Sequence, residues 1–225
     1  MEFNRRFLNE QQSELKKLLL DENQFQNAKE LFLRHHAMLH SARMAKRDLW
    51  SYPDEIFGDL LETQVRLIPP KSEHSIAWLI WHITRIEDIT MNLLVAGSSQ
   101  VFQRDGWYER IGVIAIDTGN TMDEEDIAKL SQTIQVETLL DYRIFVGRRT
   151  EEIVHGLEPG QINQPVDPTR IAQVLAEGAV VEAASVLTDY WSKRTIAGLL
   201  LMPATRHPIV HLNEADRLKQ KILKI

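Results

Sequence analysis

The chain contains no cysteine in its 225 residues. This absence excludes disulfides, thiolate metal ligands and a thiol nucleophile supplied by the protein itself. A metal ion bound to this chain must therefore be held by nitrogen and oxygen atoms. Because a chain without cysteine suits a reducing compartment, we expect a cytoplasmic protein.

Long apolar runs and basic clusters are also missing. No segment approaches the roughly 18 uncharged apolar residues that a membrane span needs, and the first residues, MEFNRRFLNEQQ, lack the apolar core of a signal peptide. The net charge of −6 arises from 26 basic and 32 acidic residues that are interspersed, without a basic cluster that would follow a phosphate backbone. We therefore expect a soluble protein that binds neither membranes nor nucleic acid.

Apolar residues recur with a period of 3.6 along most of the chain, which predicts helices. The pattern, together with proline and glycine stops, predicts four long helices, over residues 24–49, 76–96, 121–155 and about 191–224. Pro203 and Pro208 should kink or segment the last helix because each lacks a backbone donor. Long connections separate these helices. The expected fold class is therefore all-α, a four-helix bundle with long crossover connections and extra short helices.

The length of the chain fits one domain, which we expect to cover residues 1–225. Residues 1–20 form a predicted N-terminal extension with a short amphipathic segment. Residues 100–121 and 161–190 are predicted to be inserted loops or short helices, because turn residues interrupt the helical pattern there.

Three histidines form the most informative pattern. His82 lies in SIAWLIWHITRIED, and His207 and His211 lie four residues apart in TRHPIVHLNEADRL. Residues four apart on a helix project from one face, about 6 Å from each other, where two imidazoles can share one ion. A third imidazole from another helix completes a three-nitrogen site with open positions, which is the arrangement of a reactive metal centre.

The faces of the helices favour this site. His82 lies in the middle of an apolar stripe, whereas Thr84, Glu87, Asp88 and Met91 are expected to point away from the core. An unpaired polar group in a core costs about 1 to 3 kcal/mol, and a shared metal ion would satisfy all three imidazoles. The alternative, favoured by spacing alone, has no metal: His82 is a core histidine bonded to a carbonyl, and His207 lies at a helix start.

The other histidines have simpler interpretations. His36 and His40 are also four apart, with His35 beside them, and surface exposure or a supporting role explains their spacing. His74 and His155 lie at predicted helix ends, where polar residues are ordinary, and no role is predicted for them.

The segment SIAWLIWHITRIEDITMNLLVAG (residues 75–97), the loop around Trp107 and the late histidine pair resemble the DinB/YfiT-like superfamily of metal-binding four-helix bundles. The resemblance implies a three-histidine metal site, at the positions His82, His207 and His211. Many relatives have a glutamine where this chain has Glu214, on the same face as the histidine pair. This carboxylate is a candidate catalytic residue, with three open roles: fourth ligand, general base, or acceptor that orients an imidazole.

The resemblance also implies a metal-dependent enzyme. Three neutral imidazoles leave a divalent ion its full charge, so that the pKa of a bound water falls from about 15.7 toward about 7, or a bound thiol is held as thiolate. We expect transfer of a low-molecular-weight thiol such as bacillithiol, mycothiol or glutathione, which must bring the sulfur that this chain lacks. The alternatives are a metal-dependent hydrolase with the same residues and a non-catalytic, stress-related helical binding protein. Zinc suits the nitrogen ligands best, while nickel, iron and manganese remain open.

The remaining expectations concern the surroundings of the site. Arg85 is a weaker candidate for anion contact, with a surface ion pair as the simpler interpretation. Trp78, Trp81 and Trp107 are expected in the core. The two insertions are expected to cover the site or form a dimer contact. We expect a small-molecule substrate and a homodimer, since symmetric dimers are the commonest assemblies.

Overall fold

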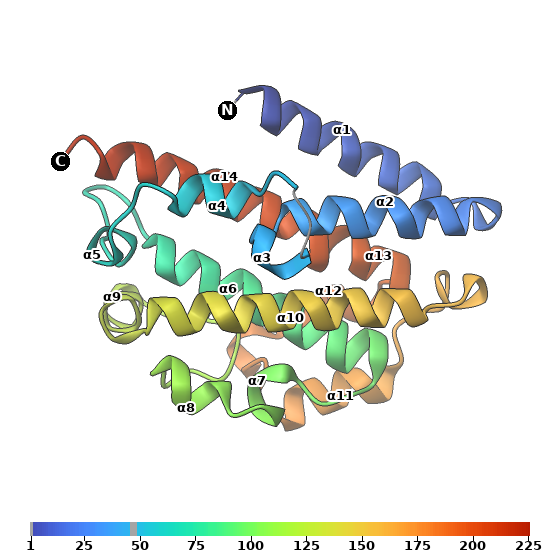
Figure 1. Cartoon of the computed structure of the whole chain (residues 1–225). Coiled ribbons are helices and arrows are strands. Elements are labelled where there is room, and N and C mark those ends of the chain that lie inside the picture. The colour runs from blue at the N-terminus through green and yellow to red at the C-terminus, as the bar shows by residue number, and fades with distance from the viewer. Residues whose placement is uncertain (1, 46–48) are drawn as a thin grey trace.

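A computed structural model describes residues 2–45 and 49–225. Over these residues the chain is helical, with one isolated β-bridge, between Pro165 and Thr195, and no β-strand. Within the described ranges, no helix combines the length and apolar character needed to cross a bilayer. Four long helical segments pack together (Figure 1): α2 (Phe25–Met38), α6 with its continuation η2 (Ile76–Asp88 and Ile89–Ala96), α10 (Val136–Gly156), and α13, η5 and α14 (Ile196–Leu201, Met202–Arg206 and His207–Ile222). The predicted all-α bundle is confirmed.

The α6–η2 segment is the central element, because α10 and α14 both pack against it. Every residue from 76 to 95 is buried. The expectation that Thr84, Glu87, Asp88 and Met91 point away from the core is therefore wrong. These residues face other segments instead of solvent: α2 and α10 cover Thr84 and Glu87, and the first of the two inserted segments covers Asp88.

Arg85 and Asp88 are the centre of that covered face. Asp88 accepts hydrogen bonds from the Tyr142 hydroxyl at 2.6 Å and from the first two backbone N–H groups of α7 (Val101–Arg104) at 2.9 Å each. Arg85 donates to Asp88 at 3.3 Å and to the Gln100 side chain at 2.6 Å. Both side chains are fully buried, so the predicted surface ion pair of Arg85 is wrong. The pair attaches the inserted segment to the bundle, and these bonds occupy the Arg85 guanidinium.

The N-terminal extension is one long helix, α1 (Glu2–Leu19), and not a short amphipathic piece. Leu8, Leu15 and Leu19 share one face of α1 and are buried. This face packs along α2 and α13 (Figure 1). The extension therefore covers the bundle and contributes apolar residues to its core.

The first predicted helix, over residues 24–49, is shorter than expected. It ends at Met38, and a single turn, α3 (Ala42–Ala45), follows it. Residues 46–48 lie outside the described residues.

The predicted helix over residues 121–155 is two helices, α9 (Glu124–Thr133) and α10. Ile134 adopts an extended backbone conformation, with ψ of 134°, and the Gln135 N–H donates to the Ile111 carbonyl at 2.8 Å. The break lets the chain turn without leaving this donor unpaired.

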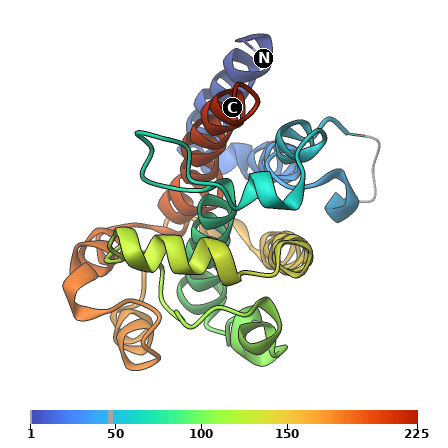
Figure 2. The same cartoon turned by 90° about the vertical axis from the view of Figure 1, so that its left-hand side faces the viewer.

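Short helices fill the connections. Both predicted insertions contain them, and Figures 1 and 2 place both insertions on the side of the bundle away from α1. The short helices are α4 (Tyr52–Phe57), α5 (Glu62–Val65), α7, α8 (Trp107–Ile111), α11 (Pro168–Ala176) and α12 (Ser185–Ser192), with 3₁₀ turns η1 (Glu22–Gln24), η3 (Pro159–Gln161) and η4 (Glu182–Ala184).

The last segment is divided as the prolines predict. Pro203 lies in η5, a π-helical turn, and prolines and π turns are both places where the regular hydrogen-bond ladder of a helix is interrupted. Pro208 is the second residue of α14, directly after the π turn, where the hydrogen bonds return to the four-residue spacing of an α-helix. The segmentation therefore occurs before His207, and the backbone between His207 and His211 is regular α-helix.

Candidate metal centre

The structure brings His82, His207 and His211 together. Each offers a ring nitrogen, and the three nitrogens lie within 4.8 Å of one another. The Nε2 atoms of His82 and His207 are 3.2 Å apart. The ring centroid of His211 lies 5.1 Å from that of His82 and 4.6 Å from that of His207. Two packed elements, α6 and α14, supply the whole site.

The π turn before α14 determines where the histidine pair begins. The His207 N–H donates to the Met202 carbonyl, five residues earlier. The α-helix then starts at His207, so that His211 lies one turn further along the same face. His207 is therefore at a helix start, as the alternative without a metal supposed, but this position is compatible with a ligand role.

His82 is fixed by one hydrogen bond and one stacking contact. It is 3% exposed, and its Nδ1–H donates to the Thr118 carbonyl at 2.6 Å. This bond assigns the tautomer and leaves the lone pair on Nε2, facing His207. Trp78 stacks on the ring with centroids 4.9 Å apart and planes 10° apart. Burial, together with the nearby His211, lowers the pKa of His82 to about 3, so the imidazole is neutral at physiological pH.

Glu214 holds two imidazoles. The Nδ1–H of His211 donates to one carboxylate oxygen at 3.1 Å, and the Nδ1–H of His74 donates to the other at 3.0 Å. Burial opposes ionisation of Glu214, but the hydrogen bonds from His211 and His74 outweigh it and lower its pKa to about 2. A carboxylate with so low a pKa is a weak base at neutral pH. Of the three open roles of Glu214, this geometry favours orientation of His211.

His74 is a functional neighbour that the sequence analysis missed. It lies 140 residues from Glu214 in the chain, so no spacing rule connects the two. Its ring stacks on Trp78 with centroids 4.1 Å apart, and Trp78 in turn stacks on His82. Trp78, Trp81 and Trp107 are all buried, as expected, and Trp78 also forms one wall of the site.

The arrangement fits a divalent cation. His82 and His211 both donate through Nδ1, which leaves the Nε2 lone pairs free to act as ligands. The buried Nδ1 of His207 has no partner among the described residues, and its Nε2 faces that of His82. Burial and the two neighbouring imidazoles hold the pKa of His207 well below its ordinary value. Three neutral nitrogens on one side suit zinc or a similar ion, and His207 and His211 are only partly buried.

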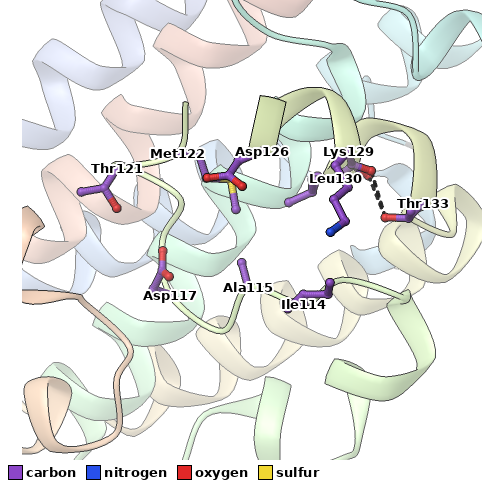
Figure 3. Close-up of a pocket in the computed structure, with 9 residues that line it drawn as sticks. All are labelled: Ile114, Ala115, Asp117, Thr121, Met122, Asp126, Lys129, Leu130 and Thr133. Carbon is purple, nitrogen blue, oxygen red and sulfur yellow. Dashed lines mark hydrogen bonds between the residues drawn. The ribbon is translucent and has the colours of Figure 1, made fainter. Parts of the chain in front are cut away.

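Two pockets lie near this centre. One, of about 280 Å³, is bounded by His207. The other, of about 260 Å³, lies between the segment 114–122 and α9, and Figure 3 shows its polar groups, among them Asp117, Asp126 and Lys129. The described residues that line this second pocket include none of the three histidines. The pocket beside His207 is therefore the one in contact with the candidate centre.

A second histidine cluster lies deeper in the bundle. His36 and His40 donate their Nε2–H groups to Glu87 at 2.7 and 3.0 Å, and the Thr150 hydroxyl donates at 2.8 Å. His36, His40 and Glu87 are fully buried, and so is His35, so the predicted surface exposure of these histidines is wrong. Burial opposes ionisation of Glu87, but the two histidines outweigh it and hold its pKa well below the ordinary value. These hydrogen bonds join α2, α6 and α10 and account for the cluster as a structural network.

Comparison with known proteins agrees with the fold. A family model described as DinB superfamily matches residues 47–215, which include the three histidines of the candidate centre. No curated protein matches the chain. The crystal structure of a conserved protein from Enterococcus faecalis is similar, with a TM-score of 0.58 and 16% sequence identity, over 84% of this chain and 95% of that chain. At this identity the structural similarity concerns the fold alone.

Proposed function

Since the chain belongs to the DinB superfamily, we propose that it is a divalent-metal-dependent enzyme in which His82, His207 and His211 hold the ion. Its reaction is the transfer of a low-molecular-weight thiol to a small-molecule substrate. One observation supports the metal site most strongly: the Nδ1 atoms of His82 and His211 are engaged by protein acceptors, while nitrogens of all three rings converge.

The residues of the chain have distinct roles in this proposal. The Thr118 carbonyl holds His82 in the ligand tautomer, and Glu214 does the same for His211. Trp78 excludes water from one side of His82. A divalent ion bound by three neutral ligands supplies a strong lowering of the pKa of a thiol or water that it binds.

The chain has no cysteine and therefore supplies no thiol of its own. If the reaction uses sulfur, the cosubstrate has to carry it. Water is the other nucleophile that the same residues accommodate, which would make the protein a hydrolase. Zinc remains the first choice of metal, because three imidazoles match its preference for nitrogen ligands.

The test is turnover by the zinc-, nickel- and manganese-loaded protein with small electrophiles, in the presence and absence of glutathione, bacillithiol or mycothiol. Thiol transfer requires consumption of free thiol that depends on the metal and is lost in His211→Ala. His155→Ala is the matched control, since His155 is exposed at the end of α10. Turnover without any thiol would replace transfer by hydrolysis. Metal-loaded protein without turnover on any substrate would favour a binding protein.

A further inference from the structure

The pocket beside His207 is built largely by an inserted segment. Helix α12, within the predicted insertion 161–190 and its flank, supplies Val186, Leu187, Tyr190 and Trp191 to its wall. The rest of the wall comes from Ile86 of α6, from Asn120, and from Met202 and Pro203 of the π turn η5. The insertion therefore forms a wall of the pocket that ends at a ligand of the candidate metal centre.

The wall of this pocket is apolar. None of the described residues that line it carries an Asp, Glu, Lys or Arg side chain. Apart from His207, its polar groups are the Asn120 amide, the Tyr190 hydroxyl and the Trp191 indole N–H. A charged ligand group would lose its hydration there without a compensating ion pair, which is strongly unfavourable. The pocket thus selects against charge.

The size of the pocket limits its occupant. Its volume is about 280 Å³, whereas an apolar cavity of about 150 Å³ accepts one benzene molecule. One or two rings, or a branched aliphatic group of similar size, therefore fit. Small-molecule sites typically combine such apolar walls with a few polar groups that fix the orientation of the ligand. In this pocket, His207 and Asn120 are candidates for that role.

We propose that this pocket binds the uncharged, apolar part of the substrate, one or two rings in size, and holds it against the metal centre at His207. The role of the pocket in catalysis rests on the proposed metal-dependent function, but its preference for apolar ligands does not depend on a bound metal. Specificity for apolar substrates is then a property of α12, in the insertion, while the three histidines supply the chemistry.

Val186 is the residue through which this inference is best tested. It lines the pocket although its side chain is 72% exposed, so a substitution there changes the rim without disturbing the core. Val186→Glu places a carboxylate at the rim of the apolar wall. Leu175→Glu is the matched control, because Leu175 is 44% exposed on the neighbouring helix α11 and does not line the pocket.

The experiment is calorimetric titration of the metal-free full-length protein with 1-naphthol and with 1-naphthalenesulfonate. We expect 1-naphthol to bind at least about tenfold more tightly than the sulfonate, a difference of about 1.4 kcal/mol. Val186→Glu should weaken 1-naphthol binding at least about tenfold, and Leu175→Glu should leave it unchanged. Absence of 1-naphthol binding, equal affinity for the sulfonate, or no effect of Val186→Glu would overturn the inference.

A second measurement locates the ligand relative to the metal centre. In cobalt-loaded protein the protons of bound 1-naphthol should relax faster than in zinc-loaded protein, because the pocket is bounded by a metal ligand. Equal relaxation in the two forms would overturn the placement. The two proposals can fail separately: binding of 1-naphthol to a protein that takes up no metal refutes the proposed function only, and metal uptake without 1-naphthol binding refutes the apolar pocket only.

Discussion

Glu214 offers a quantitative test of how the candidate centre is organised. Its two carboxylate oxygens accept one hydrogen bond each from His211 and His74, at 3.1 and 3.0 Å. Glu214→Ala removes both acceptors, so the His211 ring loses the contact that fixes its tautomer and direction. Loss of such an orienting partner typically lowers metal affinity about 10- to 100-fold, which corresponds to about 1.4 to 2.8 kcal/mol.

The chain offers graded variants for this test. Glu214→Gln keeps one carbonyl acceptor for two imidazoles, so its zinc affinity should fall less than that of Glu214→Ala. His74→Ala removes the second imidazole but leaves the bond to His211, and we expect less than about a tenfold loss. The assay is competition for zinc against a chelator of known affinity, at pH 7 and fixed ionic strength.

Two results would refute the reasoning about Glu214. If Glu214→Ala binds zinc as tightly as the parent protein, the carboxylate does not orient His211. If affinity is unchanged but metal-dependent turnover disappears, Glu214 acts as a base in the reaction, and the low pKa that the hydrogen bonds produce must rise when substrate binds. A loss of affinity in Glu214→Ala with a smaller loss in His74→Ala supports the orienting role.

Three further predictions concern stability and backbone geometry. Glu87→Gln should lower the free energy of unfolding by about 1 to 3 kcal/mol, because an amide offers one acceptor oxygen where the carboxylate accepts three buried donors. Glu30→Gln, exposed on α2, should change it little. Denaturant titration decides, and equal stability of the two variants would contradict the network. Burial lowers the pKa of His40 to about 3, so between pH 6.5 and 3 the unfolded chain binds a proton that the folded chain does not. His40 alone should therefore cost the metal-free protein roughly 1 kcal/mol of stability per pH unit as pH falls, and the lowered pKa values of His82 and His207 add to this loss. A flat profile of denaturant midpoints from pH 7 to 5 would count against this. Pro208→Ala should leave zinc affinity within about threefold of the parent, since helical backbone on both sides of Pro208, in η5 and in α14, sets the direction of His207 and His211. A larger loss would show that the proline aims His207.

The convergence of His82, His207 and His211 was predictable because their arrangement is local. The four-residue spacing of His207 and His211 survives in any regular helix, and the apolar stripe around His82 directs it toward the core. The only irregularity near them, the π turn containing Pro203, ends at His207 and leaves the helical spacing intact. A local rule applied to a regular element therefore predicted that these three histidines converge.

The errors arise where burial depends on distant segments. Arg85 and Glu87 project from opposite sides of α6, about 200° apart, and polar residues of a surface helix commonly face water. Here the inserted segment covers Arg85, while α2 and α10 cover Glu87, so that both residues join buried networks. Helical periodicity carries no information about which segments will cover a polar face.

Two further features could not be predicted for the same reason. One is the contact between His74 and Glu214, and the other is the apolar wall that α12 contributes to the pocket. Each depends on two segments far apart in the chain that meet only after folding. The break at Ile134 and Gln135 is similar, because the Ile111 carbonyl that receives the Gln135 N–H comes from the insertion. The three histidines of the candidate centre can be chosen from sequence, but the residues that orient them and bound the pocket require the tertiary structure.

The central claim is that His82, His207 and His211 hold a divalent ion. The most direct measurement is elemental analysis of the protein purified without an affinity tag, beside the triple variant His82→Ala, His207→Ala, His211→Ala, with circular dichroism to confirm that both are helical. The account predicts about one divalent ion per chain in the parent and none in the variant. No metal in the parent after reconstitution with zinc, nickel or manganese, or an ion that persists in the triple variant, would contradict it.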